Sequence, residues 1–163
     1  MRQIKARAAA ILNARPEDVY ATIADYRQGH PHILPKKNLY DLHVEQGGYG
    51  AGTIIRAKSR ILGVEQPIHH LVSEPEPGRV LVEQEIDAVH KETNSFTVTP
   101  LEPGQKSHVE ISIVMNASPG LKGFFERVII PIAIPSVLRK ELKLLEAVAQ
   151  KRGTPLITSN QSH

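Results

Sequence analysis

Eight histidines and four tyrosines are the side chains of this sequence best suited to proton transfer, and there is no cysteine to act as a nucleophile. Histidine changes charge near neutral pH, and tyrosine donates or accepts through its hydroxyl group. Tyr26, His32 and His70 lie in or beside predicted apolar segments, which makes them the candidate general acids or bases. Glu83 and Glu85 are expected to face solvent, because they alternate with the inward-facing residues of their strand.

The histidine spacing does not predict a metal site. His30 and His32 are two residues apart and His69 and His70 are adjacent, so none has the helical i, i+4 spacing typical of zinc ligands. The absence of cysteine excludes thiolate zinc and iron–sulfur sites. No P-loop, dinucleotide-binding or Gly-x-Ser-x-Gly motif occurs. We therefore predict neither a metal nor a cofactor.

The composition is that of a globular domain without a nucleic-acid partner. Twenty basic residues oppose 17 acidic ones, which gives a net charge of +3. The basic residues do not cluster, and three Phe, four Tyr and no Trp are too few for a base-stacking surface. Arg56, Lys58 and Arg60 share one strand face, and we expect them to form cross-strand ion pairs with neighbouring glutamates.

Two apolar runs are too short for membrane functions. Residues 8–12 are shorter than the core of a signal peptide, and residues 128–135 are far shorter than a bilayer span. The sequence predicts a soluble, cytoplasmic protein with no stable membrane insertion, and it leaves transient membrane contact open.

The hydrophobic period predicts strands at both sides of one short helix and a long helix at the end. The helix opens at Pro16, and a proline-rich loop with one short helical turn follows at residues 30–35. Pro131 and Pro135 are expected to kink or break the final helix, which runs for about thirty residues from residue 120. The predicted strands are residues 3–12, 39–46, 53–62, 65–73, 79–87, 92–101 and 106–116.

These elements define an α+β fold with an antiparallel meander. The final helix is predicted to bury one apolar stripe, composed of Phe124, Val128, Leu138, Leu142, Leu145 and Ala149.

Several short motifs in this order resemble the START-like (SRPBCC, helix-grip) superfamily, within it the polyketide cyclase/dehydrase and lipid-transport group. The resemblance covers about residues 3–150. The motifs are Ala14-Arg15-Pro16-Glu17-Asp18-Val19-Tyr20 leading to Ala24-Asp25-Tyr26, Gly50-x-Gly52-Thr53, Pro75-x-Pro77-Gly78-Arg79-Val80-Leu81, Val98-x-Pro100-Leu101, Gly120-Leu121-x-Gly123 and Lys140-Glu141-Leu142-Lys143-Leu144-Leu145.

The resemblance implies a helix-grip fold, with a curved antiparallel sheet of about seven strands wrapped around the long C-terminal helix. One helix and a short broken helix follow the first strand. Residues 1–152 would form a single ligand-binding domain, and residues 153–163 a polar, frayed tail. The motifs specify turns and apolar faces, so they imply the fold and not a particular activity.

One helix cannot cover a curved sheet completely, and the gap forms a cavity for small apolar ligands. Strand alternation leaves open which of His69 and His70 faces inward. Ala57 and Ser59 are small for a tightly filled core. Ser59 and Gln84 would place polar groups in the apolar cavity wall. The predicted ligand-binding residues are Ile55, Ala57, Ser59, Ile61, His70, Val82, Gln84, Phe96, Val98, Ile111, Ile113, Met115, Phe124, Phe125 and Val128.

The first functional hypothesis is binding, and with it transport or sequestration, of a small hydrophobic molecule such as a lipid, isoprenoid or polyketide. The first alternative is a cyclase or dehydratase that uses a cavity histidine or tyrosine as general acid or base. The second is a regulatory protein-interaction module whose core is filled by its own side chains. The sequence favours binding over catalysis, and it leaves open whether the chain is a monomer or a homodimer.

Overall fold

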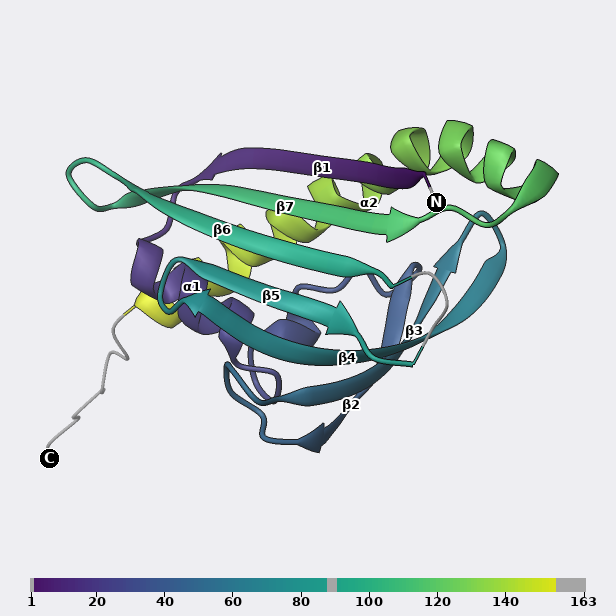
Figure 1. Ribbon diagram of the computed structural model, residues 1–163. Helices are drawn as coiled ribbons and strands as arrows, with labels where there is room; N and C mark the ends of the chain where they lie inside the picture. The colour runs from purple at the N-terminus through teal and green to yellow at the C-terminus, as the bar shows by residue number, and fades with distance from the viewer. Residues whose placement is uncertain (1, 88–90, 155–163) are drawn as a thin grey trace, which may run out of the picture.

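The computed structural model describes residues 2–87 and 91–154 and has one seven-stranded antiparallel sheet with a long helix on one side (Figure 1). The strand order is β1-β7-β6-β5-β4-β3-β2, so the first strand joins the sheet next to the last. Residues 155–163 of the predicted tail lie outside the described part. The strands are β1 (Gln3–Leu12), β2 (Leu39–Gln46), β3 (Ile54–Ile61), β4 (Val64–Glu76), β5 (Val80–Glu85), β6 (Thr93–Leu101) and β7 (Lys106–Asn116).

Two helical segments link the first two strands. Helix α1 (Pro16–Ala24) begins with proline at its first turn, and Glu17 and Asp18 lie near its positive end. A single turn of 3-10 helix, η1 (His30–His32), follows it. The predicted short turn in the proline-rich loop is therefore confirmed.

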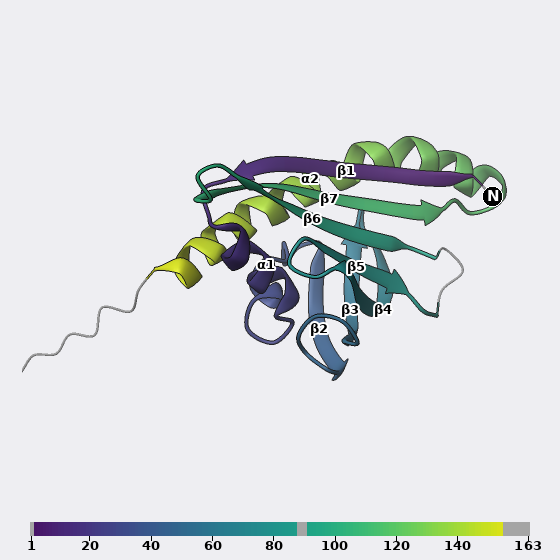
Figure 2. The same cartoon turned by 60° about the vertical axis from the view of Figure 1, so that its left-hand side comes forward.

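Helix α2 (Gly120–Gly153) begins near the N-terminal end of β1 and ends beside α1, on one side of the sheet (Figures 1 and 2). Pro131 and Pro135 lie inside it, and neither breaks it into two helices. The first half turns away from the direction of the second half in Figure 1, as expected where proline removes backbone hydrogen bonds.

The two halves of α2 differ in burial. Leu138, Leu142 and Leu145 in the second half are almost fully buried and belong to the main hydrophobic core. The predicted stripe is wrong in the first half, where Phe124 is 54% and Val128 49% exposed. The bend at the prolines explains the difference, because a stripe of constant helical period cannot face the same surface on both sides of a bend.

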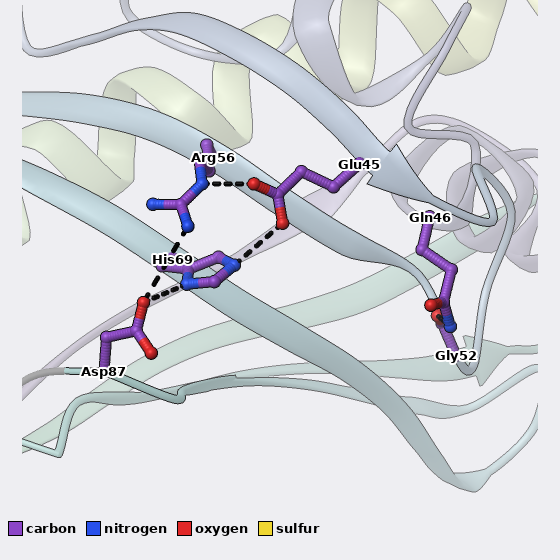
Figure 3. Close-up of polar contacts among 6 residues, drawn as sticks. All are labelled: Glu45, Gln46, Gly52, Arg56, His69 and Asp87. Atoms are coloured by element: carbon purple, nitrogen blue, oxygen red, sulfur yellow. Dashed lines mark hydrogen bonds and ion pairs between the residues drawn. The ribbon is translucent and has the colours of Figure 1, made fainter.

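The outer face of the sheet carries the expected ion pairs. Arg56 contacts Glu45 and lies 3.9 Å from Asp87, and His69 bridges the same two carboxylates (Figure 3). Beside this network, the Gln46 side chain donates to the Gly52 carbonyl oxygen at 3.2 Å. The same strand supplies two more pairs, Lys58 with Asp41 and Arg60 with Glu65.

No helix in the described part of the chain is both long enough and apolar enough to cross a bilayer.

Candidate functional site

A cavity of about 670 Å³ lies between the concave face of the sheet and α2. Its wall is largely aliphatic, and the aromatic and imidazole groups on it are those of Phe96, Phe125, His30 and His70. The aliphatic wall residues from the sheet are Leu39, Leu42, Ile55, Ala57, Ile61, Val64, Ile68, Ile111 and Ile113, and those from α2 are Ile129, Ile130, Ile134, Val137 and Leu138.

One end of the cavity reaches the surface. Leu62 and Val64, at the hairpin between β3 and β4, are 69% and 58% exposed, and Phe125 of α2 is 53% exposed. Lys122, on the first turn of α2, also lines the cavity and is largely exposed. We call Leu62, Val64, Lys122 and Phe125 the entrance. The entrance lies between the β3–β4 hairpin and the first turns of α2.

Another part of the cavity wall is buried and polar. We call His30, His70, Glu83, Asn94 and Glu141 the inner end. They come from η1, β4, β5, β6 and α2, so the whole fold is needed to bring them together. Each of the four ionisable members is at most 4% exposed. Charged groups at such depth need partners, because burial in apolar surroundings opposes ionisation.

Glu83 is the best-partnered group of the inner end. The Tyr26 hydroxyl donates to its Oε1 at 2.6 Å, and the Asn94 amide donates to its Oε2 at 3.2 Å. His30 Nε2 lies 3.5 Å from Oε1, and His70 Nδ1 lies 3.5 Å from Oε2. Burial opposes ionisation of Glu83, but these partners outweigh it and lower its pKa to about 2. Glu83 is therefore a carboxylate at neutral pH.

A close backbone turn holds His30 beside Glu83. The His30 and Gly29 amides both donate to the Asp25 carbonyl oxygen, which folds the chain back at the end of α1. A Cβ atom on Gly29 would lie 2.5 Å from the Thr22 carbonyl oxygen, so only glycine fits there. His30 Nδ1 then donates to the Ile23 carbonyl at 2.8 Å. This fixes the ring with Nε2 toward Glu83.

Aromatic packing seals the cluster from the α1 side. The Tyr26 and His30 rings stack with centroids 4.5 Å apart, and Phe96 meets the His30 ring edge-on at 5.6 Å. Burial, followed by the charge of Glu83, raises the pKa of Tyr26 well above its ordinary value. Tyr26 therefore stays neutral and acts as a hydrogen-bond donor to Glu83.

His70 presents its ring to the cavity wall with Glu83 behind it. Burial lowers the pKa of His70, but the Glu83 carboxylate, aided by Glu92 and Glu85, raises it above its ordinary value overall. The Asn94 amide oxygen is buried and has no hydrogen-bond partner among the described residues. Glu92, half-buried on the same wall, has a pKa raised mainly by burial.

Glu141 is as deeply buried as Glu83, but it lacks the partners of Glu83 and its pKa is shifted in the opposite direction. It is 3% exposed, lines the cavity from α2, and forms no hydrogen bond or ion pair with any residue in the ranges 2–87 and 91–154. Burial, followed by the negative charge of Glu83, raises its pKa to about 8. The inner end thus holds one ionised and one neutral carboxyl group at neutral pH, an arrangement that separates a base from an acid.

Ten of the 15 predicted ligand-binding residues line the cavity. His70 is among them, and of the pair His69 and His70 it is the one that faces inward. The ten are Ile55, Ala57, Ser59, Ile61, His70, Phe96, Ile111, Ile113, Met115 and Phe125. Their role in binding stays a prediction.

The facing of β5 was predicted wrongly by one residue. Val82 and Gln84 do not line the cavity; Leu81 and Glu83 are buried on the inward side, and Gln84 is exposed. The expectation that Glu83 faces solvent is therefore also wrong. A strand slip of one residue exchanges its faces, and the two sets of β5 residues are similar in polarity.

Three further predicted wall residues lie elsewhere. Val98 is fully buried in the main core and does not line the cavity, because α1 packs over β6 there. Phe124 and Val128 project to the outside of α2, and their neighbours Phe125 and Ile129 line the cavity instead.

Of the three candidate proton-transfer residues, only His70 lines the cavity. Tyr26 is fully buried behind the wall and donates to Glu83. His32 is exposed on η1, whereas its neighbour His30 lies at the inner end. A 3-10 helix has three residues per turn, so side chains two positions apart point in different directions.

Five residues of the cavity wall are absent from the predicted site residues: His30, Glu83, Glu92, Asn94 and Glu141. One of them carried a usable signal, because helical spacing from Leu138 and Leu145 places Glu141 on the buried face of α2. Within residues 2–87 and 91–154, no group of three or more His, Cys, Asp or Glu residues is arranged to hold a metal ion.

Comparison with solved structures identifies the same fold. The KanY protein structure is 26% identical, with a TM-score of 0.77, and the match covers 92% of this chain and 99% of that one. The Zhui aromatase/cyclase from Streptomyces sp. R1128 is 13% identical, with a TM-score of 0.75 and coverage of 93% and 96%. Norcoclaurine synthase from Thalictrum flavum, solved with dopamine and hydroxybenzaldehyde, is 13% identical, with a TM-score of 0.68 and coverage of 94% and 90%.

No match to a curated protein sequence was found. A family model described as polyketide cyclase / dehydrase and lipid transport matches residues 3–150, which is nearly the whole described chain. The seven-stranded sheet, the long C-terminal helix and the cavity between them agree with that assignment. The chain therefore belongs to the polyketide cyclase/dehydrase and lipid-transport family.

Proposed function

We propose that this protein binds a small, mostly apolar molecule in the cavity between the sheet and α2, with a polar group of that molecule at the inner end. The main support for this proposal is the combination of an aliphatic cavity wall with one buried polar region. Small-molecule sites are typically of this kind, with volumes of roughly 300–1,000 Å³. The cavity volume of about 670 Å³ falls within that range.

Burial of the ligand would supply most of the affinity. Apolar surface removed from water contributes about 25 cal/mol per Å², so a ligand burying roughly 250 Å² gains about 6 kcal/mol before the cost of immobilising it. The polar inner end would then fix the ligand's orientation. The exposed apolar side chains at the entrance, Leu62, Val64 and Phe125, would lower the barrier for an apolar molecule to enter.

A fluorescent titration tests this proposal. The probe is 6-propionyl-2-dimethylaminonaphthalene (Prodan), a neutral apolar ketone whose emission reports the polarity around it. Ala57→Phe fills the cavity from β3 and should weaken Prodan binding roughly tenfold or more. The control is Ala9→Phe, at an exposed position of β1, which should leave binding unchanged.

Ser59→Leu provides a second filling variant, in case Ala57→Phe does not fold. Circular dichroism of every variant establishes that it is folded before binding is compared. Absence of Prodan binding to the unaltered protein, or equal binding by the folded filling variants and the control, would contradict the proposal.

One observation favours a second function, acid–base catalysis on the bound molecule. The inner end holds a neutral acid, Glu141, and a histidine, His70, supported by an ionised glutamate. An aldol cyclisation followed by dehydration needs a base to remove a proton next to a carbonyl and an acid to protonate the departing hydroxyl group.

This second function predicts turnover of a linear poly-β-ketone to an aromatic product with a new ultraviolet absorption. His70→Ala should abolish turnover, whereas His43→Ala, at an exposed position of β2, should not change it. Unchanged turnover in His70→Ala would exclude His70 as the base, and no turnover by the unaltered protein would leave binding as the function.

A further inference from the structure

Glu141 is an acidic residue on the buried face of α2, where the other side chains are apolar. Its neighbours on the same helix face, Leu138, Leu142 and Leu145, are almost fully buried in the core. Glu141 is equally buried, but its side chain lines the cavity. A buried carboxyl group costs folding free energy unless another group compensates for its lost hydration.

No described residue provides that compensation. Glu83, the other carboxyl of the inner end, receives hydrogen bonds from Tyr26 and Asn94 and lies close to two histidines. Glu141 has no such partner in the ranges 2–87 and 91–154. Because its pKa is raised to about 8, it carries a proton at neutral pH and presents a hydrogen-bond donor to the cavity.

The charges around the cavity disfavour an anionic ligand at this end. Among the described residues of the wall, there is no arginine, and the one lysine, Lys122, is at the entrance. The inner end contains the Glu83 carboxylate, with Glu92 beside it, and both histidines lie against Glu83. A ligand carboxylate brought there would lose its hydration without gaining an unshared cation.

We infer that Glu141 is a specificity-determining residue that donates a hydrogen bond to a neutral oxygen atom of the ligand, a ketone or hydroxyl oxygen, and that the cavity discriminates against carboxylate ligands such as fatty acids. The inference rests on the proposed function and narrows it to a chemical class of ligand. The Glu141 carboxyl supplies the donor, and the surrounding acids supply the discrimination.

The test is competition of four probes of equal chain length, 2-decanone, decanoate, decylamine and decane, against Prodan at neutral pH. We expect 2-decanone to compete at least tenfold more strongly than decanoate or decylamine. In Glu141→Leu the affinity for 2-decanone should fall roughly tenfold, the loss expected when one buried hydrogen bond is removed. Affinity for decane should not fall.

Glu141→Gln is the decisive companion variant, because its amide still donates a hydrogen bond in nearly the same shape. It should keep the affinity for 2-decanone within about threefold, whereas Glu141→Leu should also shift the emission of bound Prodan to shorter wavelength. Glu76→Leu, at an exposed position of β4, is the matched control and should change nothing.

The outcomes separate the inference from the proposed function. If Prodan does not bind to the unaltered protein, there is nothing for the four probes to displace, and the proposed function is overturned. Displacement by decane and 2-decanone with equal affinity in the unaltered protein and in Glu141→Leu overturns only the inference. Stronger competition by decanoate or by decylamine than by 2-decanone also overturns it, since each would show that the inner end selects a charged group.

Discussion

Two adjacent histidines on β4 lie in similar sets of residues on opposite faces of the sheet. His69 faces outward and contacts the carboxylates of Glu45 and Asp87, with Arg56 completing the network (Figure 3). His70 faces inward and lies 3.5 Å from Glu83. The chain thus places the same acid–histidine chemistry twice, separated only by the thickness of the sheet.

The surroundings, not the residue types, decide what each cluster does. The side chains of Glu45 and Asp87 are 38% and 62% exposed, whereas that of Glu83 is 6% exposed. Water and salt weaken the outer pairs. Inside, removal from water makes each partner costly to lose and shifts the pKa values of Glu83 and Glu141 in opposite directions. Of the two clusters, the inner one therefore combines strong coupling with a position on the cavity wall.

Removal of the two central carboxylates should give the largest contrast. Glu83→Gln leaves His30, His70 and Tyr26 without their ionised partner in a buried site, which should lower the free energy of unfolding by about 3–5 kcal/mol. Glu45→Gln, on the outer face, should lower it by less than about 1 kcal/mol. Urea unfolding of both variants checks this. Equal losses would show that burial does not distinguish the clusters.

Glu141→Gln should stabilise the protein, and increasingly so as the pH rises. The pKa of Glu141 is about 8 in the folded protein against an ordinary value of 4.5, so its ionisation opposes folding above pH 4.5. Stability is therefore fully present below that pH and is lost as the pH rises through 8. Removing the charge should add about 4 kcal/mol near pH 8 and almost nothing near pH 4.5.

Thermal unfolding of both proteins across this pH range measures the difference. A constant offset between Glu141→Gln and the unaltered protein would show that Glu141 is already ionised and hydrated in the cavity.

Tyr26→Phe should have a smaller effect and should change acid stability. Loss of the hydrogen bond to Glu83 should cost about 2 kcal/mol at neutral pH. The pKa of Glu83 is lowered to about 2, so its contribution is present above its ordinary pKa of 4.5 and is lost as the pH falls through about 2. Without the Tyr26 hydroxyl, acid unfolding should begin at higher pH. Circular dichroism measures the acid unfolding of both proteins. An unchanged midpoint pH in Tyr26→Phe would argue against the coupling between Tyr26 and Glu83.

The smallest effect is expected for the outer network. Arg56→Ala should change stability by at most about 1 kcal/mol, and 1 M salt should remove most of the difference. Urea unfolding at low and high salt measures both values. A larger loss that persists in salt would mean that the outer network is as strongly coupled as the inner one.

The order of helices and strands could be predicted from the sequence, because turn residues and hydrophobic periodicity are local properties of the chain. Both β2 and β7 match their predicted bounds, and helix α1 begins at Pro16 as expected. The facing of β5 could not be predicted locally, because an inward Glu83 is acceptable only when Tyr26 and His70 arrive from other segments. No local pattern reports such partners.

Most residues of the inner end could not be predicted either, because their positions depend on contacts between distant segments. Glu141 is the exception. His30 depends on the backbone turn at Gly29, and Asn94 on the register between β5 and β6. Glu141, however, lies at helical spacing from Leu138 and Leu145, so its burial follows from the sequence. Its position beside a cavity depends on the bend of α2, which the sequence predicts only as a kink or a break.

A crystal structure of the protein with bound Prodan would show where the probe lies and which group its ketone oxygen contacts. We expect electron density for the probe between β3, β4 and α2, with its ketone oxygen within hydrogen-bonding distance of the Glu141 carboxyl group. Density for Prodan only on the outer surface, or a ketone oxygen directed toward the entrance with Glu141 bound to another group, would contradict it.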